Sequence, residues 1–250
     1  MGLKSILESR RPGGTLGKVL LYEFLSAFCA SVFILFYRVR VRGSKNVPAT
    51  GPLLIAANHQ SFLDPPLIGS FVRQRHLSFV ARIGLFHFKP FAWLISALNS
   101  VPINDEAGDA GAIREILKRL REGHAVLIFP EGSRTEDGGQ KPFKRGVALL
   151  MKRAKCPVVP AAVDGCFNAW GPDSIFPRLI GHRVAVTYGK PIPYEELEKD
   201  GAQAALDRIA REVNELRLQT RACMRKSSGN SYPPRGPGDR DGEGVPSTPC

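Results

Sequence analysis

The sequence predicts an α/β fold: a mixed, mostly parallel sheet covered by helices, preceded by a hydrophobic, membrane-associating helical segment at the N-terminus. Two observations lead to this prediction. Apolar runs of strand length alternate with segments of helical period, and a long apolar run lies near the N-terminus. In such sheets the chemistry gathers in loops beyond the carboxyl ends of the strands. The expected strands lie at about 52–58, 77–82, 125–130, 157–163 and 182–189.

Amphipathic segments between and after these runs predict the helices. The clearest is 109–123, where apolar residues share one face and Gly123 stands at the expected helix stop. Two more are expected at 144–155 and 202–224. Pro160 lies inside the fourth apolar run, and because proline donates no ladder hydrogen bond, it favours an edge strand or a bulge there.

The N-terminal apolar run extends from Val19 to Tyr37 and contains one acid, Glu23. Since about 20 apolar residues span a bilayer, its length is borderline for a membrane helix. It has no signal-peptide cleavage site, and the basic residues after it suit anionic headgroups. We therefore expect residues 1–36 to be an interfacial or partly spanning anchor, with a buried core helix as the alternative. The basic residues are Arg38, Arg40, Arg42 and Lys45.

Composition predicts the domain boundaries, the kind of partner and the state of the cysteines. We expect the α/β domain at 37–225 and a disordered tail at 226–250, which is rich in Gly, Pro and Ser. The net charge is +12 and the tail is neutral, so the folded part carries an excess that suits an anionic membrane or phosphate-bearing substrates. Basic clusters without interleaved aromatic residues argue against nucleic acid. Five scattered cysteines favour reduced thiols in a cytosol-facing protein over a disulfide framework or a zinc site.

The stretch "NHQSFLDPP" places a histidine and an aspartate where the first long strand should end. Pro65 favours the first turn of a helix, and Asp64 is a good cap for that helix. If the loop folds back, the Asp64 carboxylate can instead accept the ring N–H of His59, which makes the other ring nitrogen a general base. Both roles for Asp64 stay open at this point. The spacing offers no further ligands for a metal, and we expect none.

The stretch "IFPEGSRTEDGGQKPFKRG" follows the third expected strand with a polar, glycine-bearing loop. Gly132 allows close backbone approach to a ligand, and Arg134 offers a planar fork of donors to a phosphate. Glu131 can hold that arginine or accept from a substrate hydroxyl. An ordinary polar loop with a local ion pair is the alternative. Positive potential is added by Lys141, Lys144 and Arg145.

Together, the order His-x4-Asp, FPEGSRT, F-K-x-G and V-P-A resembles the glycerolipid acyltransferase family, specifically the 1-acylglycerol-3-phosphate acyltransferases, from Tyr37 to Pro193. The resemblance implies that His59 is the general base, that Asp64 orients it, and that no covalent acyl-enzyme forms. It also implies an acyl pocket shaped by the Val159–Pro160 strand. The implied acceptor-binding residues are Glu131, Gly132, Ser133 and Arg134.

One block departs from the family pattern. Where the family carries G-x-x-F/P-I-x-R, this chain reads "NSVPIND", so Asn99 replaces the glycine and Asp105 replaces the phosphate-binding arginine. A carboxylate there would repel a phosphate. Either Arg82 or Lys144 substitutes for the missing arginine, or the acceptor carries another headgroup.

The resemblance implies an O-acyltransferase of phospholipid biosynthesis. It would move a fatty acyl chain from acyl-CoA or acyl-carrier protein to the free sn-2 hydroxyl of 1-acylglycerol-3-phosphate, giving phosphatidic acid. We expect no cofactor beyond the donor substrate, and a location on the cytoplasmic face of a membrane with anionic lipids, the inner membrane in a bacterium. The absence of GxSxG agrees with acyl transfer that uses no serine nucleophile. The alternatives are a lysolipid with another headgroup, and a catalytically silent basic membrane-binding relative.

Overall fold

The computed structural model describes residues 10–239 apart from 83, 85, 86, 88, 98, 104–107 and 200. Its centre is a seven-stranded sheet with the order β1-β7-β6-β2-β5-β3-β4. All neighbouring strands are parallel except β6 and β7. This confirms the predicted mixed, mostly parallel sheet. The strands are β1 (Arg40–Arg42), β2 (Leu53–Ala57), β3 (Leu77–Arg82), β4 (Ser100–Ile103), β5 (Ala125–Ile128), β6 (Val158–Asp164) and β7 (Ala185–Tyr188).

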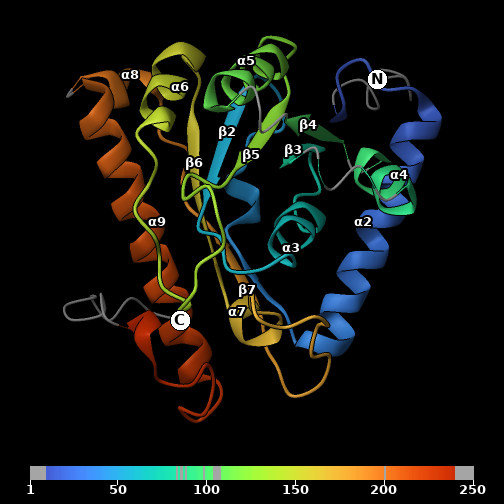
Figure 1. Ribbon diagram of the computed structural model, residues 1–250, viewed down its shortest axis with the longest axis vertical. Helices are drawn as coiled ribbons and strands as arrows, with labels where there is room; N and C mark the ends of the chain where they lie inside the picture. The colour runs from blue at the N-terminus through green and yellow to red at the C-terminus, as the bar shows by residue number, and fades with distance from the viewer. Residues whose placement is uncertain are drawn as a thin grey trace.

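Helices cover both faces of the sheet, which lies between α2 on the right of Figure 1 and α9 on the left. One face packs against α2 and α3, and the other packs against α5, α6, α8 and α9. Each face therefore has its own apolar core. The helices are α2 (Leu16–Tyr37), α3 (Asp64–Ser70), α4 (Lys89–Ala97), α5 (Gly108–Arg121), α6 (Gly146–Ala154), α7 (Cys166–Ala169), α8 (Tyr194–Glu198) and α9 (Gly201–Lys226), with short 3-10 turns at Ser44–Asn46 and Pro237–Asp239.

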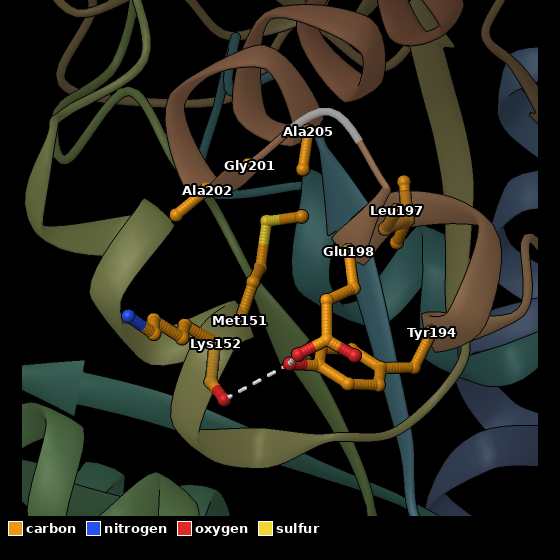
Figure 2. A pocket seen from close by; sticks show the side chains of 8 residues that line it. All are labelled: Met151, Lys152, Tyr194, Leu197, Glu198, Gly201, Ala202 and Ala205. Atoms are coloured by element: carbon orange, nitrogen blue, oxygen red, sulfur yellow. Dashed lines mark hydrogen bonds between the residues drawn. The ribbon is translucent and has the colours of Figure 1, made fainter.

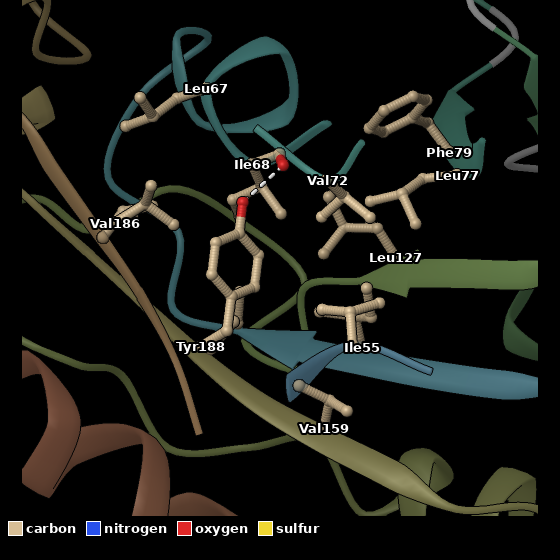
Figure 3. Packing of buried hydrophobic residues seen from close by; sticks show 14 of the residues in the cluster. Ile55, Leu67, Ile68, Val72, Leu77, Phe79, Leu127, Val159, Val186 and Tyr188 are labelled. Carbon is tan, nitrogen blue, oxygen red and sulfur yellow. Dashed lines mark hydrogen bonds between the residues drawn. The ribbon is translucent and has the colours of Figure 1, made fainter. Parts of the chain in front are cut away.

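The central strand β2 is buried on both sides, as its continuous apolar run predicts. Because side chains alternate along a strand, Ile55 belongs to the core under α2 and α3, while Leu54 belongs to the core under α5, α6 and α9. Figure 3 shows Ile55 in the first core with residues of α3 and β7. There the Tyr188 hydroxyl donates a hydrogen bond to the Ile68 carbonyl, which ties β7 to α3.

Pro160 lies in β6, which is an interior strand with β2 on one side and β7 on the other. The edge alternative is therefore wrong. The pairing with the β7 side shifts by one residue between the Ala161–Tyr188 pair and the Val158–Ile192 bridge, which is the irregularity of a bulge. The Pro160 carbonyl accepts from the Gly189 amide within this irregular stretch.

Helix α2 is the one element among the described residues that is long and apolar enough to cross a membrane by length and composition. One stripe of it, including Tyr22 and Phe33, is buried against the domain. Its acid is turned toward protein, because Glu23 pairs with Arg10 and His76. The opposite surface exposes large apolar side chains, which suits contact with lipid. The exposed residues are Leu16, Leu20, Phe24, Phe28, Ile34, Leu35 and Phe36.

The segment 227–239 folds back on α9, although composition predicted a disordered tail from residue 226. Three arginines of one helical stripe hold it. Arg217 donates to the Gly238 carbonyl, Arg221 pairs with Asp239, and Arg225 pairs with the same carboxylate. Charge pairing and carbonyl acceptors therefore order a segment that has little apolar surface to bury.

The cysteines agree only in part with the expectation of reduced thiols. Cys29, Cys156 and Cys166 are free, whereas Cys223 is disulfide-bonded.

Arg221 bridges this segment to the sheet, because its guanidinium also pairs with the buried Asp164 at the end of β6. Replacing Arg221 by methionine leaves Asp164 buried without its ion partner, so we expect the free energy of unfolding to fall by about 3 kcal/mol. The matched control on the same helix is Arg208→Met, which breaks an exposed pair with Glu196 and should cost less than about 1 kcal/mol. Urea unfolding measures both, and equal losses would contradict a bridging role.

Candidate active site

The candidate site begins where β2 ends, at the carboxyl edge of the parallel strands. Asn58 follows β2 and is fully buried. Its side-chain amide donates to the Val163 carbonyl at 2.9 Å and accepts from the Val163 amide at 2.8 Å, so the side chain replaces a backbone pair with β6. The chain is thereby held in place one residue before His59.

His59 and Asp64 form a hydrogen-bonded pair, with 2.8 Å between Nδ1 and Oδ2. The same carboxylate oxygen accepts from the backbone amides of Gln60 and Ser61 at 2.6 and 2.7 Å. The N-cap residue of α3 is Leu63, and Asp64 makes no side-chain cap hydrogen bond there. The two roles that the sequence left open are therefore decided in this structure: Asp64 orients the loop and the histidine, and the helix begins without it as a cap.

The surroundings define which ring nitrogen of His59 is available. A carboxylate can only accept hydrogen bonds. The contact with Asp64 therefore assigns the N–H to Nδ1 of His59 and leaves the lone pair on Nε2. The ring stacks on Phe129, with 4.0 Å between centroids, and the side chain is 17% exposed. Among the described residues no protein group bonds Nε2. The ring thus has a fixed orientation and one basic nitrogen within reach of a ligand.

Cys166, the first residue of α7, lies beside Asp64. Burial, and then the nearby Asp64 carboxylate, raise the pKa of its thiol well above the usual value. The thiol therefore stays protonated and neutral beside Asp64, which makes Cys166 a packing group and no nucleophile.

Glu131 ties the second loop to the first. The residue is 3% exposed, and its carboxylate accepts from the backbone amide of His59 at 3.0 Å. The loop returns the contact, since the Thr135 amide donates to the His59 carbonyl at 2.8 Å. Burial raises the pKa of Glu131 to about 8, against the lowering effect of the His59 and Lys141 amides. In this structure Glu131 bonds the backbone of His59, whereas the Arg134 guanidinium lies over the ring of Phe62.

Arg134 lies over the ring of Phe62, 3.8 Å from its centroid. Phe62 is 45% exposed and also contacts Trp170, with 5.5 Å between ring centroids. Phe62 belongs to the loop between His59 and Asp64, so the stacking brings the Arg134 guanidinium to the same loop as the base. A guanidinium held over an aromatic face keeps its in-plane donors for a phosphate.

Gly132 and Lys144 meet closely in the second loop. Gly132 has a φ of +73°, and a Cβ atom there would come within 2.3 Å of the Lys144 Cε. The positive φ favours glycine at this position, and the absence of a Cβ leaves room for the Lys144 side chain to cross the turn. The Lys144 amide also donates to the Pro130 carbonyl. Beside them, Lys141 donates to the Ser133 hydroxyl at 3.1 Å, so the predicted basic residues surround the Gly132 turn.

Besides Lys144, Arg82 was proposed to replace the missing arginine. Arg82 is the last residue of β3, at the same edge of the sheet as His59, and it pairs in register with Ile103 of β4. Asp105 lies outside the described residues. Asn99 is buried and donates from its amide to the Ser78 hydroxyl, so the residue at the glycine position fastens the turn before β4.

Sequence reasoning missed a buried polar chain behind the dyad. The Gln60 side chain donates to the Gly138 carbonyl and to Asp164, and it accepts from the Phe167 amide. Asp164 in turn pairs with Arg221 of α9. No periodicity marks Gln60 as buried, because it lies in a loop between a strand and a helix.

A separate pocket lies between α6, α8 and the start of α9 (Figure 2). Its volume is about 200 Å³, and Met151, Leu197 and Ala205 contribute its apolar wall. Since α6 runs back from the Gly132 loop toward the start of β6, the pocket lies at the amino ends of the strands. It contains none of the predicted site residues.

The raised pKa of Glu131 predicts a pH dependence of stability. In the unfolded chain this carboxyl ionises near 4.5, whereas in the folded protein it keeps its proton to about pH 8. The folded state binds the extra proton between these values, so the wild type loses stability as the pH rises through this window. Glu131→Gln keeps an acceptor for the His59 amide without the titration. We expect the variant to gain about 2 to 4 kcal/mol relative to wild type between pH 4.5 and 8. Urea unfolding across this range measures it, and a constant difference would contradict the buried neutral acid.

The chain is similar in sequence to known acyltransferases. The 1-acyl-sn-glycerol-3-phosphate acyltransferase of Bacillus subtilis is 29% identical over 145 residues, 58% of this chain and 72% of the relative. A chloroplastic 1-acyl-sn-glycerol-3-phosphate acyltransferase of Brassica napus is 30% identical over 148 residues, 58% of this chain but 42% of the relative, so the match spans less than half of that protein.

The fold has a solved counterpart as well. The crystal structure of the 1-acyl-sn-glycerophosphate acyltransferase of Thermotoga maritima superposes with a TM-score of 0.68 at 26% identity, covering 85% of this chain and 87% of that one. The acyltransferase family model matches residues 38–164, which run from the end of α2 through β6 and include both candidate loops. The chain therefore belongs to the acyltransferase family.

Proposed function

We propose that the chain transfers a fatty acyl group from acyl-CoA or acyl-carrier protein to the sn-2 hydroxyl of 1-acylglycerol-3-phosphate, giving phosphatidic acid. The observation that carries this proposal is the His59–Asp64 pair, held within one loop that also receives Arg134. The activity for which the relatives are named supports the choice of acceptor. The exposed apolar surface of α2 supports work at a membrane, which we place at the cytoplasmic face.

His59 acts as the general base in this mechanism. Its Nε2 takes the proton of the acceptor hydroxyl as the oxygen attacks the thioester carbonyl, and a tetrahedral intermediate forms. The C–S bond then breaks, and the imidazolium returns its proton to the departing thiolate. Asp64 holds the ring and stabilises its charged form during the step. A thioester is already activated, so no enzyme nucleophile is needed.

The second loop binds the acceptor phosphate. Arg134 supplies the bidentate donors, and Lys144 adds positive charge beside the Gly132 turn. Glu131 contributes by fixing the His59 backbone relative to this loop, which sets the distance between base and phosphate site.

Replacing His59 by alanine should lower kcat by at least about 100-fold, because the hydroxyl then loses its proton acceptor. The fold should survive, since the loop is still held by Asn58 and by the amide contacts of Asp64. His182→Gln, a histidine outside the site, is the matched control and should keep near-normal activity. The measurement is acyl transfer from radiolabelled acyl-CoA, and a His59→Ala enzyme of near-normal rate would sink the base assignment.

Arg134→Ala should raise the KM for the acceptor or lower turnover far more than it changes the KM for the donor, because the guanidinium binds the acceptor phosphate. Arg153→Ala, an exposed arginine of α6 at the far edge of the sheet, is the control and should leave both constants unchanged. Steady-state kinetics with each substrate varied in turn decides the matter. Equal effects of Arg134→Ala on both KM values would argue against phosphate binding.

A different headgroup is the second candidate, and Asp105 favours it, because a carboxylate stands where the family pattern has a phosphate-binding arginine. A panel of lysophospholipids with several headgroups, each offered with acyl-CoA and with acyl-carrier protein, separates the two. Preference for a zwitterionic or cationic headgroup over 1-acylglycerol-3-phosphate would replace the leading proposal.

A further inference from the structure

The loop between α7 and β7, residues 171–183, exposes an unusual amount of apolar surface. Ile175, Phe176 and Ile180 are 83%, 78% and 88% exposed, and Leu179 is 44% exposed. Single exposed apolar residues are ordinary, but four within six positions form a patch, and such patches mark contact surfaces. No element among the described residues covers the tip of this loop.

The loop is nevertheless anchored at its base. The Trp170 indole donates to the Ser174 carbonyl at 2.9 Å, and the Arg178 amide donates to the Ala169 carbonyl at 2.8 Å. These contacts fold the segment back on α7 and present its apolar tip outward. Trp170 also contacts Phe62, on which Arg134 stacks, so the loop base adjoins the candidate active site.

The loop lies beside the C-terminal end of α2, as Figure 1 shows. The Val184 amide donates to the Tyr37 carbonyl at 3.1 Å, and the Arg40 amide donates to the Val184 carbonyl at 3.0 Å. The last turns of α2 expose Ile34, Leu35 and Phe36. Two apolar surfaces from distant parts of the sequence therefore lie at the same end of the molecule.

That end is the one that carries His59. Helix α7 follows the carboxyl end of β6, which is parallel to β2, and His59 follows the carboxyl end of β2. The apolar patch and the candidate site thus face the same side of the sheet.

The charges around the apolar loop tip indicate which kind of surface it contacts. Arg38, Arg40 and Arg178 are exposed, and none of them pairs with an acid among the described residues. Asp173 is the single acid of the loop. An apolar tip with exposed arginines beside it complements a bilayer whose headgroups are anionic.

We propose that the 174–180 loop is a second membrane anchor, which inserts its apolar tip into an anionic bilayer beside the end of α2. The two anchors together hold the carboxyl edge of the sheet against the lipid surface. That this edge delivers a base to a lipid acceptor rests on the proposed function; the insertion itself does not.

The test uses the full chain and vesicles of phosphatidylcholine and phosphatidylglycerol in equal parts. The triple variant Ile175→Ser/Phe176→Ser/Ile180→Ser should partition onto these vesicles about tenfold more weakly than wild type, because three large apolar side chains no longer leave water. The matched control is Leu149→Ser, which changes an exposed leucine of α6 and should leave partition unchanged. Circular dichroism confirms that each variant is folded. Equal partition of the triple variant and wild type overturns the proposal.

Two further readouts sharpen the outcome. Arg178→Ala should weaken binding to the mixed vesicles and leave binding to pure phosphatidylcholine unchanged; equal weakening on both would overturn the electrostatic part. If the loop instead joined two copies of the chain, light scattering without vesicles would detect a dimer that the triple variant abolishes, and that result would overturn membrane insertion.

Acyl transfer is measured separately, on detergent-dispersed acceptor and on acceptor in vesicles. The proposal expects the triple variant to lose activity about tenfold on vesicles and to keep it in detergent. An inactive wild type with normal, loop-dependent partition would remove the proposed function and leave the anchor standing.

Discussion

The candidate site depends on one carboxylate oxygen, the Oδ2 of Asp64, which accepts from the His59 ring and from the amides of Gln60 and Ser61. Asp64 has no exposed surface. A buried carboxylate is tolerated only where donors satisfy it, so the loop must close around this oxygen to fold at all. Formation of the loop and orientation of the histidine are thus one event. The same donors that make burial of Asp64 possible aim the imidazole.

Support for this loop comes from the far end of the chain. Gln60 bonds Asp164, Asp164 pairs with Arg221, and Arg221 holds Asp239 in the segment after α9. Four side chains from four regions of sequence therefore form one polar path, which is buried except for its last member, Asp239. Such paths stabilise only when complete, because each unpaired member would carry a desolvation penalty. The C-terminal segment is in this sense a structural part of the candidate site.

Much of the architecture could be predicted from sequence, because its signals are local. Continuous apolar runs predicted the interior strands, and the 3.6-residue period predicted α5 and α9. The edge strands β1 and β4 were missed because neither is a continuous apolar run: β1 has two arginines among its three residues, and β4 contains a serine and a proline. The position of Pro160 was half anticipated: proline indicated an irregular ladder, but an interior place for β6 depends on strand order, which no local pattern reports.

The candidate site, too, could be predicted from the sequence only in part. The residue types of His59, Asp64 and Arg134 and their places after strands could be read directly, and the structure brings all three to one loop region. What could not be read was the direction of each contact. Glu131 bonds a backbone amide, and Arg134 stacks on Phe62, because these choices depend on burial and on neighbours that are distant in sequence. That residues 227–239 are ordered was missed for the same reason. A polar segment becomes ordered only when it finds hydrogen-bond partners such as Arg217, which lie elsewhere in the fold.

The reversal of strand direction at β7 has a geometric consequence for the whole molecule. Because β7 is antiparallel to β6 and β1 is parallel to β7, β1 starts at the edge where β2 and β6 finish. Helix α2, which leads into β1, must therefore end at that edge as well. If β1 ran with β2, the long apolar helix would end at the opposite side, and the histidine would face away from it. One reversed strand pair thus places the end of α2, the exposed apolar loop after α7 and the polar loops of the candidate site at the same edge of the sheet.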